Sequence, residues 1–296
     1  MRIRTMCSAV LLSALVGTAG PAFAQGGGAD EEVRRAVERA VGSSIASSVA
    51  ESLSRSIVSE GLQLMPRATL FTSPFYNRTE GDFDFGSFEA DTYGGVVGGL
   101  FKVHDIFLIH GAVAGAALTT DVTFDGDKTS IDAHFIEFRL GGDLVFLNTQ
   151  PVKAWLTLEG GVSNFDTELT DSIWAWRAGP SATLSVRGGN VLFEPNVGFS
   201  FSNTFEDDDA DTTTTFQTGF SVKYRGDKWR PQLNFAYAKV IDPDLGDDGF
   251  ISVGPEILYA VTPSVLVGAA YSYGTPLTSG IDVDSHTVTL QARWTF

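Results

Sequence analysis

The sequence predicts an all-β transmembrane protein, a 12-stranded antiparallel β-barrel preceded by one N-terminal α-helix. Three observations predict this fold. The chain opens with an apolar segment typical of export, continues with a stretch whose apolar residues recur every fourth position, and then alternates apolar and polar residues to its end. They divide the chain into a signal peptide at 1–24, a helix at 25–65 and a barrel at 66–296.

The first segment has the layout of a cleavable secretory signal peptide. Arg2 and Arg4 precede an apolar run, and a small-residue AFA motif precedes Gln25. The cysteine Cys7 lies inside this segment, so we expect no disulfide, thiolate metal site or cysteine nucleophile in the mature chain. No later apolar run approaches the roughly 18 residues of a membrane helix. If the mature chain crosses a membrane, it must do so with strands.

Residues 25–65 predict one helix of about 30 residues. The stretch lacks proline, opens with acidic residues suited to a helix N-terminus, and ends at Gly61. The pattern is compatible with a surface helix or coiled coil. It is also compatible with a helix fitted into a narrow space, because small side chains flank the apolar stripe. The stripe is Val33, Val37, Val41, Ile45, Val49, Leu53 and Ile57, and the small residues are Ala36, Ala40, Ser44, Ser47, Ser48 and Ala50.

From Arg67 onward the period is two, as in strands with one face toward lipid and the other toward water. In 228–240 and 284–296 the alternation is clearest. Each predicted strand is long enough to cross a bilayer, which takes about 9 to 11 tilted residues. The predicted strands are 67–77, 88–102, 105–119, 131–146, 151–164, 173–187, 190–203, 213–225, 228–240, 250–260, 263–274 and 284–296.

The connections between these segments alternate, with six long loops and five short ones. Twelve antiparallel strands need this pattern when both chain ends lie on the short-loop side, as in outer-membrane barrels with short periplasmic turns. Prolines inside strands predict bulges or local gaps, because each removes a ladder donor. These are Pro180, Pro195, Pro231 and Pro255, and the candidates for aromatic girdles are Tyr76, Trp174, Trp176, Trp229, Tyr237, Tyr271, Tyr273 and Trp294.

The C-terminal stretch VTLQARWTF alternates to its last residue, Phe296. Closing a barrel pairs the last strand with the first and leaves no edge in lipid. The terminus also resembles the signal by which outer-membrane proteins are recognised for assembly, which implies the outer-membrane assembly machinery as a partner.

A signal peptide, one long helix and twelve strands ending in QARWTF together resemble the translocator domain of autotransporters, the type V secretion family. The resemblance implies a helix that threads the barrel and leads to an exported passenger. Geometry allows this, since a barrel about 24 Å across leaves a lumen of about 12 Å for a helix about 10 to 12 Å wide. The glycines of YGGVVGGLF, Tyr93 to Phe101, either leave room for the helix because they have no side chain, or allow barrel curvature and bulges.

Two departures from the family matter. About five residues separate the predicted cleavage site from Ala29, and 25–65 contains no asparagine for self-cleavage. We therefore expect no passenger of the usual kind.

The charge balance excludes some partners. There are 36 acidic and 20 basic residues, and losing Arg2 and Arg4 leaves 18 − 36 = −18, which disfavours nucleic acid. Twenty of the acidic residues lie in the long loops, where solvation is the favoured interpretation. Carboxylates there could also bridge to lipopolysaccharide through divalent cations, although no loop has full calcium-site spacing. We expect outer-membrane lipid and lipopolysaccharide as partners, and no cofactor.

Strand parity predicts a set of charged residues that face the lumen. They could contact the helix, set ion selectivity, or form salt bridges that stiffen the wall, which is the favoured interpretation. The set is Glu137, Arg139, Asp143, Glu159, Arg177, Glu194, Arg230, Glu256 and Arg293.

An enzyme is disfavoured, because Ser285 and His286 are sequence neighbours that should point to opposite faces of a strand. The favoured function is a pore or helix-plugged channel of the outer membrane. One alternative is a structural or adhesive surface protein that works through its acidic loops. Another places the helix in the periplasm as a coiled coil. Solute and oligomeric state stay open.

Overall fold

The computed structural model describes residues 67–83, 86–124, 127–167, 170–205, 212–241, 249–277 and 282–296. The predicted signal peptide and helix lie outside these residues. The described part of the chain contains no helix long and apolar enough to cross a membrane. It forms twelve strands: β1 Ala68–Phe83, β2 Gly86–His104, β3 Phe107–Phe124, β4 Asp127–Asn148, β5 Val152–Thr167, β6 Thr170–Gly188, β7 Val191–Thr204, β8 Thr213–Tyr224, β9 Trp229–Val240, β10 Gly249–Thr262, β11 Val265–Pro276 and β12 Asp282–Thr295.

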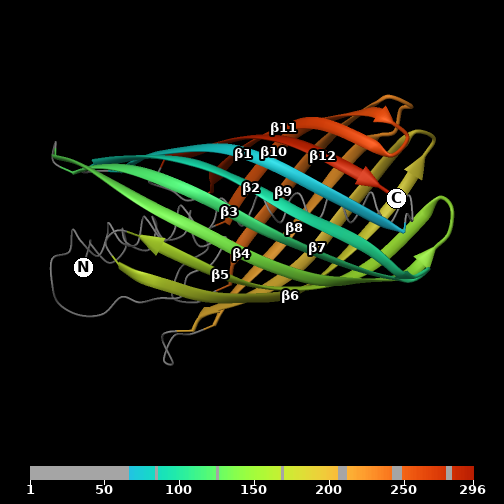
Figure 1. The fold of residues 1–296 in the computed structure, drawn as a ribbon, viewed down its shortest axis with the longest axis horizontal. Coiled ribbons are helices and arrows are strands. Elements are labelled where there is room, and N and C mark those ends of the chain that lie inside the picture. Colours follow the sequence, from blue (N-terminus) through green and yellow to red (C-terminus); the bar gives the residue numbers. More distant parts are fainter. Residues whose placement is uncertain are drawn as a thin grey trace.

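The twelve strands close into one antiparallel barrel, as predicted (Figure 1). Each strand pairs with its sequence neighbours, and β12 pairs with β1. The closure extends to the last residue, because the Phe296 amide donates to the Ala68 carbonyl at 2.9 Å and the Phe296 carbonyl accepts from the Arg67 amide at 3.1 Å. The alternating C-terminus is therefore part of the wall.

The first half of the barrel differs from the predicted loop pattern. Strands β1 to β6 run for 16 to 22 residues, whereas β7 to β12 run for 12 to 14. The connections expected as long loops at 77–86, 119–130 and 164–171 are mostly strand. Hydrogen-bonded strand pairing continues through the polar residues of these three stretches. Their threonines and aspartates alternate between the two faces, as in the rest of each strand. Figure 1 shows β1 to β4 reaching beyond the other strands at the end away from the C-terminus.

The outer face of the barrel is an apolar belt. Val97, Leu140 and Leu158 are 62%, 67% and 65% exposed, as suits side chains in contact with lipid. The strand registers place all eight aromatic residues predicted for the girdles on this face. The closed ladder and apolar exterior identify the chain as an outer-membrane β-barrel.

Three of the four predicted strand prolines, Pro180, Pro195 and Pro255, lie at local gaps in the ladder, whereas at Pro231 the β9–β10 pairing is continuous. Around Pro180 the β6–β7 pairing passes from Ala178 to Ser181 with no change of register, and around Pro255 the β10–β11 pairing likewise omits two positions. The predicted gaps are confirmed there, and no bulge occurs at either proline. Register shifts occur instead near strand ends, as between Lys102 and His104.

Two glycines of β2, Gly94 and Gly98, lie beneath aromatic rings of β1. Across 93–101 the register is unbroken on both sides, so the predicted bulges are wrong. A Cβ on Gly94 would lie 2.5 Å from the Phe75 ring, and one on Gly98 would lie 2.4 Å from the Phe71 ring. The inward-facing rings thus lie flat over a neighbouring strand.

Candidate functional site: the polar side of the lumen

The inner wall has two chemically different sides. Along β2 and β3, and at neighbouring positions of β1, β4 and β5, many inward side chains are apolar and buried, which differs from the water-facing character expected of that face. The same strands also carry inward polar residues, and those of β3 to β5 form a cluster. Along β6 to β12 the inward positions are mainly serine, threonine, asparagine, glutamine and charged residues. The buried apolar cluster comprises Phe71, Phe75, Phe88, Ala90, Val96, Ala112, Ala114, Leu118, Val122, Ile131, Ala133, Phe135, Phe165 and Val283.

A cavity of about 290 Å³ lies inside the barrel. Side chains from β3 to β12 line it, and both signs of charge are present. Among the predicted lumen residues, those that line it are Glu137, Arg139, Glu159, Arg177, Glu194 and Glu256.

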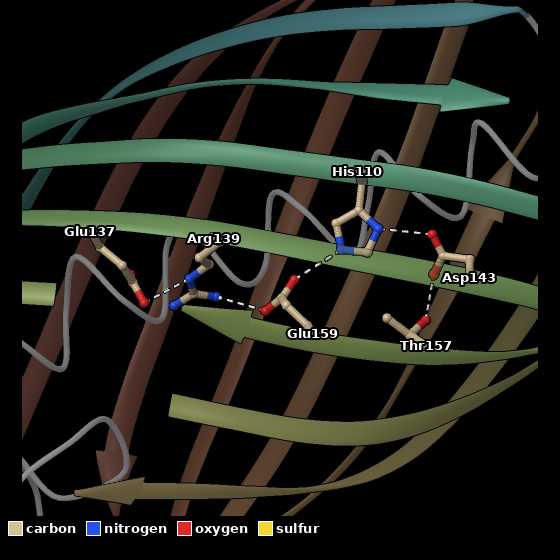
Figure 2. Close-up of polar contacts among 6 residues, drawn as sticks. All are labelled: His110, Glu137, Arg139, Asp143, Thr157 and Glu159. Carbon is tan, nitrogen blue, oxygen red and sulfur yellow. Dashed lines mark hydrogen bonds and ion pairs between the residues drawn. The ribbon is translucent and has the colours of Figure 1, made fainter. Parts of the chain in front are cut away.

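The first polar cluster, on β3 to β5, is drawn in Figure 2. Arg139 forms ion pairs with Glu137 at 2.8 Å and with Glu159 at 3.4 Å. Glu159 and Asp143 both contact His110, at 3.1 Å and 2.8 Å. Thr157, which faces Asp143 across the β4–β5 pair, donates to it at 2.6 Å. Three carboxylates of this cluster therefore share one arginine and one histidine.

His110 is the centre of this cluster. Its Nδ1 faces Asp143 and its Nε2 faces Glu159, so each ring nitrogen has a carboxylate oxygen within hydrogen-bond distance. A neutral imidazole has only one N–H, whereas an imidazolium can donate to both carboxylates. The ring also lies over Gly141, where a Cβ would come within 2.3 Å of Nε2. The geometry thus fits a positively charged histidine laid against the wall.

The second cluster joins β6, β7 and β8 around Glu194. Lys223 forms an ion pair with its carboxylate at 2.7 Å, and the Ser185 hydroxyl donates to it at 3.0 Å. Glu194 is only 2% exposed, and Lys223 is 7% exposed. This buried acid is neutralised within the wall.

The third cluster joins β9, β10 and β12 around Glu256. Arg293 and the Gln291 amide each contact Glu256 at 2.8 Å, and Gln232 also donates to it. The Gln291 carbonyl accepts from the Arg293 Nε at 2.9 Å. Both of the charged side chains are almost fully buried.

The nine predicted lumen residues thus lie in different settings. The first cluster holds four of them, the second holds Glu194, and the third holds Glu256 and Arg293. Arg177 pairs with Gly161 and Ser202 in the ladder, and Arg230 lies near the start of β9.

The prediction missed two cations that complete these clusters. His110 and Lys223 both lie on inward positions that strand parity alone assigns, Lys223 two residues after Ser221. Applying the alternation to every charged residue of β3 and β8 would have found them.

The other chemistry considered is not assembled in the described residues. Ser285 bonds with Asn77 and Thr79 on the inner face, whereas His286 contacts the Tyr271 hydroxyl on the outer face. The predicted opposite orientation of this serine and histidine is confirmed. Within the described ranges, no three histidine, cysteine or acidic side chains gather as metal ligands would.

Solved structures share this barrel fold. The translocator domain of the autotransporter NalP from Neisseria meningitidis matches 84% of the chain and 98% of its own length, with 9% identity and a TM-score of 0.51. The β-domain of the Bordetella autotransporter BrkA matches 78% of the chain and 100% of its own length, with 13% identity and a TM-score of 0.52.

A COG4313 outer-membrane channel from Pseudomonas putida F1 is also similar. It matches 78% of the chain and 96% of its own length, with 8% identity and a TM-score of 0.54. No protein-family model matches the sequence, and no curated protein sequence matches it. The barrel therefore has the fold of autotransporter translocator domains and of this channel.

Proposed function

We propose that this protein is an outer-membrane pore or channel whose lumen is plugged by the helix predicted at 25–65. The observation that carries the proposal is the two-sided inner wall, which has a buried apolar cluster centred on β1 to β4 and, on its other side, a cavity lined by charges of both signs. The solved structures with this fold include a protein described as an outer-membrane channel.

The apolar side of the wall supports a plug with one apolar face. The predicted helix carries its valines, leucine and isoleucines at every fourth position from Val33 to Ile57, and such a stripe needs an apolar surface to cover it. The inner face of β1 to β4 offers phenylalanine, leucine, valine and alanine. We place the stripe against those strands, because burial of apolar area on both surfaces would stabilise the plug.

The polar side supports a plug with a neutral opposite face. Glu194 and Glu256 are paired with cations of the wall itself, so they do not require charges from an occupant. Residues 42–50, GSSIASSVA, carry no charge and several hydroxyl groups. They suit a surface of wall amides and hydroxyls.

Single-channel conductance in planar bilayers tests the proposal. We compare the refolded mature protein with a variant that begins at Met65. A plug predicts low conductance in the mature protein and a rise of at least about tenfold in the variant, because a lumen about 12 Å wide would be open to ions. Equal conductance would contradict the plug and favour the periplasmic coiled coil or a surface role.

Disulfide trapping gives an independent test of the plug's location. The mature sequence has no cysteine, so introduced pairs report without background. We expect Ala114→Cys, which is inward-facing and 2% exposed, to cross-link with one of Val37→Cys, Val41→Cys or Ile45→Cys. Val113→Cys is the matched control, because it lies one residue away and is 43% exposed on the lipid face. Equal trapping by both positions, read as mobility shifts in non-reducing gels, would contradict the proposed site.

A second candidate is a surface protein that works through its acidic residues. The observation favouring it is the extension of β1 to β4, whose outward positions carry Glu80, Glu89, Asp91, Asp121 and Asp132. This candidate predicts that neutralising these five acids, together with the acidic stretches at 205–212 and 241–249, abolishes surface binding and leaves conductance unchanged.

A further inference from the structure

The first polar cluster has more acids than bases within the described residues. Its three carboxylates share one arginine and one histidine (Figure 2). Arg139 lies 2.8 Å from Glu137 and 3.4 Å from Glu159, so one guanidinium is divided between two acids. In the part of the chain that the structure describes, the Oε2 atom of Glu137 is buried and has no hydrogen-bond partner. A further cation at this cluster would stabilise it, because buried charges need partners of opposite charge.

Glu159 is the acid of this cluster that an occupant of the lumen can reach. Its side chain is 21% exposed, whereas those of Glu137 and Asp143 are 3% and 0% exposed. On the neighbouring strand β6, Arg177 faces Gly161, which lies two residues beyond Glu159 toward the end opposite the short turns. Both Glu159 and Arg177 line the cavity. The wall thus presents an acid nearer the short turns and a base farther from them.

The length of chain before β1 decides which arginine of the predicted helix lies at this depth. Glu159 is seven residues after Val152, where β5 begins at the short-turn end. At about 3.3 Å per residue and a tilt of about 40°, it lies about 18 Å from that end. Arg55 is twelve residues before Arg67, which precedes β1 at the same end. At the helical rise this is also about 18 Å, whereas Arg39 would lie about 42 Å away.

Arg55 also lies on the face of the predicted helix that we place against β1 to β4. Val37 and Arg55 are 18 residues apart, which is about five complete helical turns. When Val37 faces the apolar side of the wall, Arg55 faces the same side nearer the short turns, where the first cluster lies. Glu51 is one turn farther from the short turns on this face. Helix and wall therefore carry opposite charges in matching order.

Building on the plugged channel proposed above, we propose that Arg55 forms an ion pair with Glu159 and that Glu51 forms one with Arg177. Arg55 gives the first cluster three cations for its three carboxylates. The two pairs set the depth and rotation of the plug, because a shift of one turn would place Glu51 beside Glu159, and like charges repel.

Cross-linking in the refolded mature protein tests the depth. The mature sequence has no cysteine, so a short bis-maleimide reports only on introduced pairs. A direct disulfide is unsuitable, because the Cβ atoms of an arginine and a glutamate that form an ion pair are too far apart. We expect Arg55→Cys to link to Glu159→Cys, read as a mobility shift in denaturing gels.

Two matched pairs control the cross-linking. Leu158→Cys is one residue from Glu159 and is 65% exposed on the lipid face, so it should not link to Arg55→Cys. Arg39→Cys lies too far along the helix to link to Glu159→Cys. Failure of the Arg55→Cys pair with Glu159→Cys, or equal yield in either control, would overturn the proposed depth.

Single-channel conductance of full-length variants tests the ion pair itself. Arg55→Gln and Glu159→Gln should each raise the conductance of the mature protein by at least about threefold, because each weakens the hold on the plug. The double variant should rise no further than the larger single effect, since independent effects would multiply. Arg39→Gln removes the same charge elsewhere on the helix and should change nothing. Unchanged single variants, or fold-changes that multiply, contradict the pair.

The variant that begins at Met65 separates this inference from the plug on which it rests. When that variant conducts far more than the mature protein but the tests of Arg55 fail, the plug stands and its register is different. Equal conductance of the two proteins would mean that the plug itself is wrong, and the ion pairs with it.

Discussion

Replacing Arg293 with methionine is expected to lower the free energy of unfolding by about 3–5 kcal/mol. Arg293 lies 2.8 Å from Glu256, and the two side chains are 2% and 5% exposed. Methionine keeps much of the packing volume but leaves the Glu256 carboxylate with only the amides of Gln232 and Gln291. A buried charge without its counter-ion is among the most destabilising changes in a protein interior.

Urea unfolding of the barrel refolded into lipid vesicles measures this loss. An exposed ion pair supplies the control. Lys128 and Asp121 are also 2.8 Å apart, but their side chains are 64% and 31% exposed. Lys128→Met should therefore change the free energy of unfolding by less than about 1 kcal/mol.

A double variant separates the lost charge balance from lost packing. Adding Glu256→Gln to Arg293→Met removes the orphaned charge, so most of the stability should return. If the double variant is as unstable as Arg293→Met, packing of the arginine stem dominates and the electrostatic explanation is wrong.

The number and order of the strands could be predicted because alternation is a local property of the sequence. In β12, Leu290 and Trp294 share one face while Gln291 and Arg293 share the other, and no tertiary information is needed to see this. Strand parity also assigns Glu137 and Glu256 to one face of their strands by the same argument.

Strand ends were harder to predict for the first half of the barrel. The stretch NRTEGDFDFG is rich in turn formers, which favoured a loop. In the structure β1 continues to Phe83, because pairing with both β2 and β12 supplies ladder bonds that outweigh local preference.

Partners across strands could not be read from the sequence, since they depend on register. Nothing local connects His110 with Asp143 or Glu159, which lie 33 and 49 residues away. The same applies to the glycines of β2. Their spacing predicted small wall positions, but the rings of Phe71 and Phe75 that occupy those positions come from another strand.

Adding a side chain at a glycine that lies beneath an aromatic ring is the second change expected to have a large effect on stability. Gly98→Val is expected to destabilise the barrel by about 2–3 kcal/mol, because overpacking forces side chains or backbone to move. A Cβ there would lie 2.4 Å from the Phe71 ring and 2.5 Å from the Gly111 carbonyl oxygen. Gly95→Val is the matched control on the same strand. The nearest atom to its Cβ is 3.7 Å away, so its unfolding in urea should change little.

Rescue variants show whether the ring or the wall opposes the added side chain. Removing the ring with Phe71→Ala should restore only part of the stability lost in Gly98→Val, because the Gly111 carbonyl cannot rotate away. At Gly274 the three nearest atoms to an added Cβ all belong to the Phe250 ring. Phe250→Ala should therefore relieve the clash in Gly274→Val more fully, leaving mainly the cost of the lost ring packing. If ring removal restores the same fraction of stability at both positions, the backbone moves as readily as a side chain. The glycines would then not be needed to make room for the rings.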